Sequence, residues 1–200
     1  MSKDVLFRIR NSQLLFMFET DRLILRSLDE RDVDAIFAMR SDAEVMRFIR
    51  EPQNRAESVN WVKLVSSRWA SDGIGFCAVI EKQTNEFVGW CGLWRLKESG
   101  ELELGYAIAR YFWGRGFATE AARIFLEYAF EQLKPQKIVA VAEPENASSR
   151  RVMEKVGMKF VRLGEFYNRE LVQYAVDKYD WEKLRQNKTE KSLTLKNLEF

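Results

Sequence analysis

The stretch IARYFWGRGFATEAA, residues Ile108–Ala122, joins an apolar strand to an amphipathic helix through two closely spaced glycines. Gly114 and Gly116 let the backbone turn tightly, because neither carries a Cβ atom. The helix that begins near Phe117 leaves its first amides without internal partners, and its dipole is positive at that end. Such a helix start suits a pyrophosphate, with Arg115 as a cationic side chain beside it. The loop alone leaves a second interpretation open, a plain turn without a ligand.

The residue inventory restricts the chemistry around this loop. The loop lacks both the GxGxxG spacing of dinucleotide-binding folds and the Gly-Lys-Ser/Thr of a P-loop. The chain has no histidine, which removes Ser–His and Cys–His dyads and the usual histidine metal sites. Cys77 and Cys91 lack metal-ligand spacing and are expected to be small core residues. We therefore expect no metal, and proton transfer must use Glu, Asp, Tyr, Ser, Cys, Lys or water.

Composition indicates one domain of ordinary size. The 200 residues are 46% hydrophobic and 31% charged, which is normal for a globular chain. The net charge of +2, from 32 basic and 30 acidic residues spread along the chain, gives no basis for nucleic acid binding. No apolar run reaches the ~18–20 residues needed to span a bilayer, so no membrane association is expected. The apolar run at 14–18 is too short for a secretory signal, and we expect a cytoplasmic protein.

Hydrophobic periodicity on both sides of the loop predicts about seven strands and four helices, in the order β-α-α-β-β-β-α-β-α-β-β. Asp29 and Asn146 are expected to cap helices, and Pro135 to end one. The strands are expected at 20–27, 74–81, 87–95, 101–109, 137–142, 158–164 and 170–179, and the helices at 29–40, 55–71, 117–133 and 146–156.

This order predicts a single α/β (α+β) domain with one mixed, largely antiparallel sheet. The strands 101–109 and 137–142, joined by one helix, would be parallel neighbours through a right-handed crossover. The domain is expected to span residues 19–184. Residues 1–18 would be an extension, either disordered or an additional edge segment, and residues 185–200 a polar tail.

Three segments carry a family resemblance: TDRLILR from Thr20, ELGY from Glu103 with YFWGRGFATEA from Tyr111, and NASSRRVMEKVGM from Asn146. Together they resemble the GNAT superfamily of N-acetyltransferases, and within it the ribosomal-protein N-terminal acetyltransferases of the RimJ/RimL kind. The resemblance covers roughly residues 18–184. The superfamily pattern has Gln or Arg where this chain has Trp113, a departure that is typical of that branch.

The resemblance implies an acetyl-CoA site between two parallel strands that splay apart, one ending at Ala109 and the other starting near Lys137. It implies that the pantetheine arm bonds to the first of these strands like an added strand, while the pyrophosphate lies on the glycine loop. The alternation of Gly105, Ala107 and Ala109 leaves space on one strand face. The expected cofactor-binding residues are Ile108, Ala109, Arg110, Gly114, Arg115, Gly116, Phe117, Ala118, Thr119 and Asn146.

Two residues are catalytic candidates. Glu103 is the expected base, directly or through a water, because related enzymes carry a glutamate near the substrate at this place. Its alternative role is that of a surface glutamate on the same strand face as Glu101. The tyrosine that many superfamily members use to protonate the thiolate corresponds to Met153, so Ser149 is the candidate acid. Its alternative role is hydrogen bonding at the start of a helix.

The acceptor is expected to be a primary amine. The resemblance to the RimJ/RimL branch favours a protein N-terminus as the acceptor. A small amine such as a polyamine, an antibiotic or an amino acid is an alternative acceptor. A CoA-binding module without catalysis is a different class that the glycine loop fits equally well. The oligomeric state is open between monomer and homodimer. Four aromatic residues are expected to belong either to the acceptor pocket or to the core: Trp69, Phe76, Trp90 and Tyr174.

Overall fold

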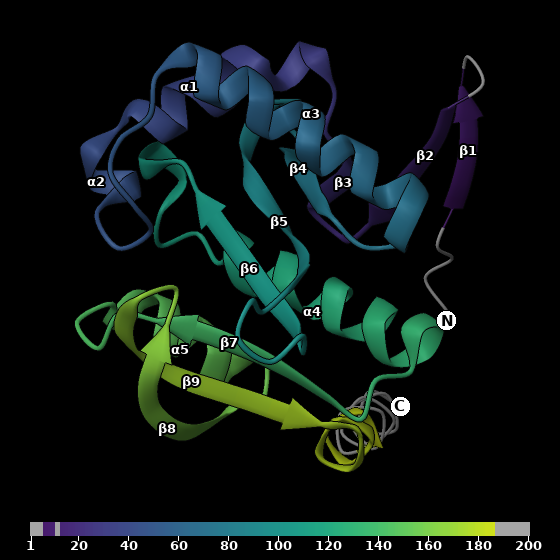
Figure 1. Ribbon diagram of the computed structural model, residues 1–200. Helices are drawn as coiled ribbons and strands as arrows, with labels where there is room; N and C mark the ends of the chain where they lie inside the picture. Colours follow the sequence, from purple (N-terminus) through teal and green to yellow (C-terminus); the bar gives the residue numbers. More distant parts are fainter. Residues whose placement is uncertain (1–5, 11–12, 187–200) are drawn as a thin grey trace, which may run out of the picture.

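The computed structural model describes residues 6–10 and 13–186, which fold around one nine-stranded sheet of order β1-β2-β3-β4-β5-β6-β7-β9-β8 (Figure 1). Every neighbouring pair is antiparallel except β6 and β7. The strands are β1 (Leu6–Arg10), β2 (Gln13–Glu19), β3 (Leu23–Ser27), β4 (Phe76–Glu81), β5 (Phe87–Arg95), β6 (Leu102–Ile108), β7 (Lys137–Ala142), β8 (Lys159–Phe166) and β9 (Arg169–Asp177).

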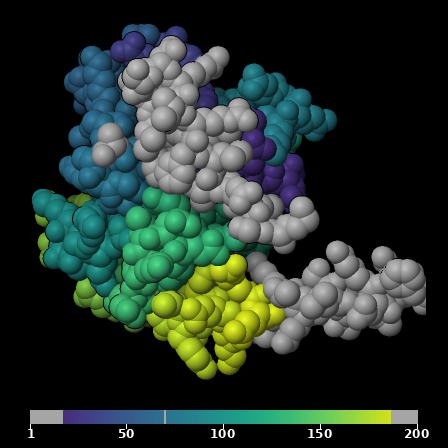
Figure 2. Space-filling view, turned by 90° about the vertical axis from the view of Figure 1, so that its right-hand side faces the viewer, coloured from purple at the N-terminus to yellow at the C-terminus, as the bar shows by residue number. Residues whose placement is uncertain are grey.

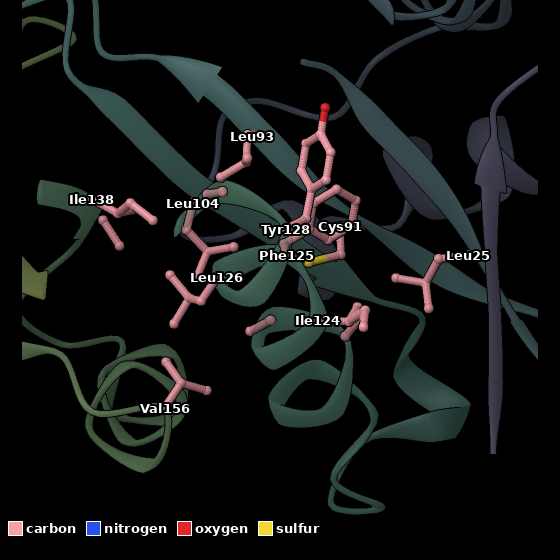
Figure 3. Packing of buried hydrophobic residues seen from close by; sticks show 14 of the residues in the cluster. Leu25, Cys91, Leu93, Leu104, Ile124, Phe125, Leu126, Tyr128, Ile138 and Val156 are labelled. Atoms are coloured by element: carbon pink, nitrogen blue, oxygen red, sulfur yellow. The ribbon is translucent and has the colours of Figure 1, made fainter. Parts of the chain in front are cut away.

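Helices cover both faces of the sheet. One face carries α1 and α3, whose buried residues pack with Ala78, Trp90 and Ala107 of the sheet. The other face carries α4 and α5, and Figure 3 shows Leu93 and Leu104 of the sheet close to Phe125 and Leu126 of α4. The helical elements are η1 (Glu30–Asp32), α1 (Val33–Ser41), α2 (Ala43–Met46), α3 (Arg55–Asp72), η2 (Arg110–Phe112), α4 (Phe117–Tyr128), η3 (Ala129–Leu133) and α5 (Ala147–Lys155).

The predicted fold class, a single α/β domain with a mixed and mostly antiparallel sheet, is confirmed. The sheet has two strands more than expected, because β1 and β2 form a hairpin whose second strand pairs with β3 at the sheet edge. The single-turn α2 was also not expected, since four residues are too few to show helical periodicity. Cys77 and Cys91 are fully buried, as predicted.

Two helix ends differ from the prediction. Asp29 does act as a cap, but the turn that follows it is a 3₁₀ turn and α1 begins only at Val33. The helix at 117–133 is α-helical only as far as Tyr128, and a π-helical turn completes it.

The last strand is shorter than expected, because residues 178–186 are helical. Trp181 of this segment stacks on Phe130 with a centroid distance of 5.6 Å, and Arg185 pairs with Glu131. Figure 2 shows the yellow C-terminal segment against the green surface that includes α4. Residues 1–5 and 187–200 lie outside the described residues, so the proposed boundaries of extension and tail stay predictions. Within the described chain, no helix is long and apolar enough to cross a membrane.

The parallel pair β6 and β7 separates after a short contact, as the resemblance implied. Only Leu102 with Ile138 and Glu103 with Val139 are paired across these strands. Beyond that point β6 stays paired with β5 and β7 with β9. Figure 1 shows the two strands diverging toward the side where α2 lies. The sheet therefore opens in its middle, with Glu103 where the opening begins.

Candidate active site

A groove of about 1300 Å³ occupies the opening between β6 and β7. Its walls come from α2, β6, the glycine loop, the start of α4, α5 and the β8–β9 turn. Nine of the twelve predicted site residues line it: Glu103, Ile108, Gly114, Gly116, Phe117, Ala118, Thr119, Asn146 and Ser149. The structure thus brings together residues that are up to 46 positions apart, from Glu103 to Ser149.

The edge of β6 offers peptide groups to this groove. The N–H of Ala109 donates to Val88 O of β5 at 2.9 Å, so that peptide faces β5. Because the peptide groups of an antiparallel strand alternate in direction, those of Tyr106 and Ile108 face the opening instead. The carbonyl of Ile108 accepts from Trp113 Nε1 at 2.6 Å. The backbone edge is therefore Tyr106 to Ile108, two residues earlier than the expected Ile108 to Arg110.

The remaining member of the expected edge, Arg110, has left the strand. It opens the 3₁₀ turn η2, and its side chain lies 4.0 Å from Asp42 Oδ2 at the start of α2. Neither Ala109 nor Arg110 is among the residues that line the groove. The structure thus places both outside the predicted contact region.

The glycine loop has the predicted geometry. Gly114 has φ of +76° and Gly116 has φ of +80°, in the left-handed region that favours glycine. Gly116 is the N-cap of α4 without a side-chain cap, and the first internal bond runs from Glu120 N to Gly116 O at 3.1 Å. The amides of Phe117, Ala118 and Thr119 therefore point out of the helix start. These donors at the positive end of the dipole fit an anion such as a pyrophosphate.

The chain segment before β3 holds this helix start in place. Glu120 accepts hydrogen bonds from Thr20 Oγ1 and from Arg22 Nε, the latter at 2.7 Å. Arg22 Nη1 also donates to Arg115 O at 2.9 Å, which ties the loop backbone to the same side chain. The TDR segment that the resemblance singled out thus braces the glycine loop.

The side chain of Arg115 does not lie where it was expected. Its guanidinium pairs with Glu81 Oε1 at 2.7 Å and lies 4.9 Å from the ring centroid of Phe117. Glu81 is buried, and pairing its carboxylate offsets the cost of removing that charge from water. The Arg115 side chain thus pairs with a carboxylate and lies outside the groove lining, and its predicted contact with a pyrophosphate stays a prediction.

Ser149 belongs to a hydrogen-bonded pair that the sequence did not indicate. Tyr106 Oη lies 3.0 Å from Ser149 Oγ and donates to Ser149 O at 2.9 Å. Asn146 Oδ1 accepts from Ser149 N at 3.0 Å, so Asn146 caps α5 while the Ser149 hydroxyl stays available. Burial raises the pKa of Tyr106 above its usual range, so the phenol is protonated and can donate.

Glu103 meets a second tyrosine from a distant part of the chain. Tyr167 Oη donates to Glu103 Oε2. Burial raises the pKa of Glu103 to about 7, and the bond from Tyr167 opposes that rise. A carboxylate with a pKa near neutrality is suited to accept a proton at physiological pH. Glu101 differs, since its ion pair with Lys137 at 2.7 Å helps to hold its pKa below the usual value.

Tyr167 occupies an unusual backbone conformation. It lies in the two-residue turn between β8 and β9 with φ of +54°, and Asn168 follows with φ of +57°. A bulky side chain rarely adopts this region, and such positions concentrate at functional sites. Glu98 Oε1 accepts from the Tyr167 amide at 2.7 Å, which helps to fix the turn. The turn thus delivers the phenol to Glu103, and a left-handed tyrosine is not readable from sequence.

Replacing Tyr167 with phenylalanine is expected to move the acidic limb of the pH–rate profile to higher pH. The lost hydrogen bond lowers the pKa of Glu103 in the native protein, so its removal lets that pKa rise. Activity at neutral pH then falls while the plateau at alkaline pH is kept. Profiles of kcat/KM from pH 5 to 10 measure this, with Tyr179→Phe at an exposed position as control. An unmoved limb would contradict the Tyr167–Glu103 coupling.

Aromatic rings line the face of the sheet that carries Glu103. The sequence left open whether four aromatic residues belong to a pocket or to the core. Phe76 and Trp90 line the groove, whereas Trp69 and Tyr174 are core residues. Phe76 stacks on Trp94 with a centroid distance of 5.7 Å and on Trp61 at 5.8 Å. This wall and Glu103 lie on one face of β6, and Tyr106 lies on the other. A base and an acid therefore approach the open strand edge from opposite faces.

Comparisons with known proteins agree with this geometry. A family model described as an acetyltransferase (GNAT) domain matches residues 22–159. The protein YkkB of Bacillus subtilis is 31% identical over 164 residues, which is 80% of this chain and 95% of that protein. A GNAT-family acetyltransferase structure from Bacillus anthracis superposes with a TM-score of 0.69 at 27% identity, covering 81% of this chain and 98% of that chain.

The family match, together with the split parallel strand pair and the glycine loop at its edge, defines this as an acetyltransferase domain. The chain belongs to the GNAT acetyltransferase family. Members of that family use acetyl-CoA. The ribosomal acetyltransferase RimL has a TM-score of 0.71 at 15% identity, with 86% of this chain and 99% of that chain covered, which shows a shared fold alone. Among the described residues, no group of three or more His, Cys, Asp or Glu side chains is arranged to hold a metal ion.

Proposed function

We propose that this protein transfers the acetyl group of acetyl-CoA to a primary amine in the groove between β6 and β7. The observation that carries the proposal is the position of Glu103, a carboxylate with a pKa of about 7, where the two strands part. The outward amides of Phe117, Ala118 and Thr119 and the strand edge of Tyr106 and Ile108 fit the pyrophosphate and the amide-bearing arm. Acetyl-CoA, when bound, supplies the activated thioester carbonyl.

In this account Glu103 removes the proton from the acceptor ammonium, directly or through a water, and leaves a neutral amine able to attack. Tyr106, held by Ser149, donates a proton to the departing thiolate from the opposite face of β6 as the C–S bond breaks. The nitrogen of the new amide loses its second proton to solvent, and solvent returns a proton to Tyr106. Tyr167 orients the Glu103 carboxylate. The sequence favoured Ser149 alone as the acid, but Tyr106 is the better proton donor of the pair because a phenol is a stronger acid than an aliphatic hydroxyl.

Tyr106→Phe is expected to lower kcat by about 100-fold, the lower end of what a positioned general acid contributes. Ser149→Ala is expected to cost less, since Ser149 O still accepts from Tyr106 at 2.9 Å. Steady-state kinetics and thermal melting are measured together. Asn54→Ala is the contrasting variant, because it removes the cap of α3 outside the groove lining and lowers the melting temperature. If the Tyr106 and Ser149 variants lost stability but kept the wild-type kcat, the two residues would have only a structural role.

The acceptor class within this proposal is an amine on either a protein N-terminus or a small molecule. The motif resemblance to the RimJ/RimL branch supports a protein N-terminus, such as that of a ribosomal protein. The proposal is tested by incubating the protein and acetyl-CoA with a panel of N-terminal peptides, polyamines, amino acids and aminoglycosides. Acceptor-dependent thiol release with a product heavier by one acetyl group is expected. Acetyl-CoA binding without turnover on any acceptor would support a non-catalytic binding module instead.

A further inference from the structure

A buried arginine lines the groove where α1 and α2 form its wall. Arg40, near the end of α1, is only 2% exposed. Its guanidinium lies 4.4 Å from the ring centroid of Trp61 and donates through Nη2 to Gln53 Oε1. Its Nε atom is buried without a hydrogen-bond partner. A buried donor without a partner is costly, so this position calls for a function beyond packing.

The charge of Arg40 is also unbalanced. Across residues 6–10 and 13–186, no carboxylate lies within 4.0 Å of its guanidinium, whereas Arg22, Arg26 and Arg115 each have such a partner. Burial lowers the pKa of Arg40 to about 10, with Arg50 contributing and Glu57 opposing. The side chain therefore still carries its positive charge at neutral pH. A desolvated cation gains most from an anion that enters its site.

Aromatic rings connect Arg40 with the proposed base. Trp61 lies under the guanidinium, Phe76 stacks on Trp61, and Trp94 stacks on Phe76. Trp94 is the direct neighbour of Glu103 across β5 and β6. One wall of the groove thus runs from a cation, over apolar rings, to a carboxylate.

We propose that Arg40 binds a carboxylate of the acceptor, whose amine reaches Glu103 across the aromatic wall. The acceptor is then an amine that carries an acidic group beyond an apolar portion, as in a short peptide segment. This inference rests on the proposed acetyl transfer for its amine end, while the anion site at Arg40 stands on its own contacts.

The test compares two acceptors that differ only in the anionic group: the tripeptide Ala-Phe-Ala with a free C-terminal carboxylate, and its C-terminal amide. We expect kcat/KM to be about tenfold or more higher for the free acid, which corresponds to roughly 1.4 kcal/mol. Arg40→Gln is expected to abolish that preference by raising KM for the acid while leaving the amide unchanged. Arg40→Lys keeps the charge and should retain part of the preference. Arg47→Gln, an exposed arginine of the same groove, is the matched control.

The competing role for Arg40 is to brace the 47–54 segment, since Arg40 O also accepts from Gln53 N at 2.7 Å. A brace would affect both tripeptides equally in Arg40→Gln, and that outcome overturns the proposal. Calorimetric titration of the two peptides into the CoA-loaded protein gives a readout independent of turnover. Selective binding of the acid that Arg40→Gln removes, without turnover, would keep the anion site and refute the acetyl transfer. Turnover of both peptides without any preference for the acid would keep the acetyl transfer and refute the anion site at Arg40.

Discussion

Glu103→Gln is expected to reduce kcat/KM for the acceptor by about 100-fold or more and to remove the acidic limb of the pH–rate profile. The wild-type carboxyl group is protonated below its pKa of about 7 and cannot then accept the amine proton. Wild-type activity should therefore fall as pH decreases through 7. The glutamine variant should be slow at every pH, with a profile governed only by the acceptor amine. Its affinity for acetyl-CoA is expected to stay near the wild-type value, because the cofactor loop is untouched.

The matched control for this variant is Glu101→Gln. Glu101 lies two residues earlier, on the same face of the chain, but it pairs with Lys137 at 2.7 Å and does not line the groove. Its replacement removes one partly exposed ion pair, which contributes at most about 1 kcal/mol to stability. We expect near wild-type kinetics from Glu101→Gln. Equal activity of both variants with an unchanged pH profile would remove Glu103 from the mechanism.

Gly116→Val is expected to weaken acetyl-CoA binding by at least about tenfold, the equivalent of 1.4 kcal/mol. Gly116 has φ of +80°, a region that costs an L-residue roughly 1–2 kcal/mol and a β-branched residue more. The loop must relax to relieve this strain, and the amides of Phe117, Ala118 and Thr119 then lose their common direction. Equilibrium titration of acetyl-CoA measures the effect. The KM for acetyl-CoA should rise in parallel, with a smaller change in kcat at saturation.

Gly100→Val separates the loop's function from general backbone strain. Gly100 has φ of +72° in the turn between β5 and β6, and an added Cβ would meet nothing within 4 Å. The substitution imposes a similar conformational cost at a residue that does not line the groove. We expect it to lower thermal stability without changing acetyl-CoA affinity. Tight binding by Gly116→Val, or equally weak binding by both variants, would contradict the role given to the helix start.

What the sequence predicted well is local. Gly114, Gly116 and the helix after them follow from conformational rules that act over a few residues. The separation of β6 from β7 came from the family resemblance, and pairing of only two residues confirms it. The short α2 was not predicted, because four residues show no period. An additional edge segment was one of the two interpretations of residues 1–18, and the β1–β2 hairpin at the sheet edge agrees with it.

What the sequence could not predict depends on contacts between distant positions. Tyr167 reaches Glu103 from 64 residues away, through a turn whose left-handed tyrosine has no sequence signature. Arg115 was assigned to the pyrophosphate because it stands between two glycines, yet its guanidinium forms an ion pair with Glu81 on β4. Tyr106 was part of a quoted motif without a role, and only the fold places it on Ser149. In each case tertiary structure selects the partner of a polar side chain.

A crystal structure of the protein with bound CoA would show directly whether the opening between β6 and β7 is the cofactor site. We expect the pyrophosphate on the amides at the start of α4 and the arm along the edge of Tyr106 and Ile108. We expect the thiol in the opening of the sheet, between Glu103 on one face of β6 and Tyr106 on the other. CoA bound outside the opening between β6 and β7, or a thiol remote from both side chains, would exclude Glu103 and Tyr106 as the base and the acid.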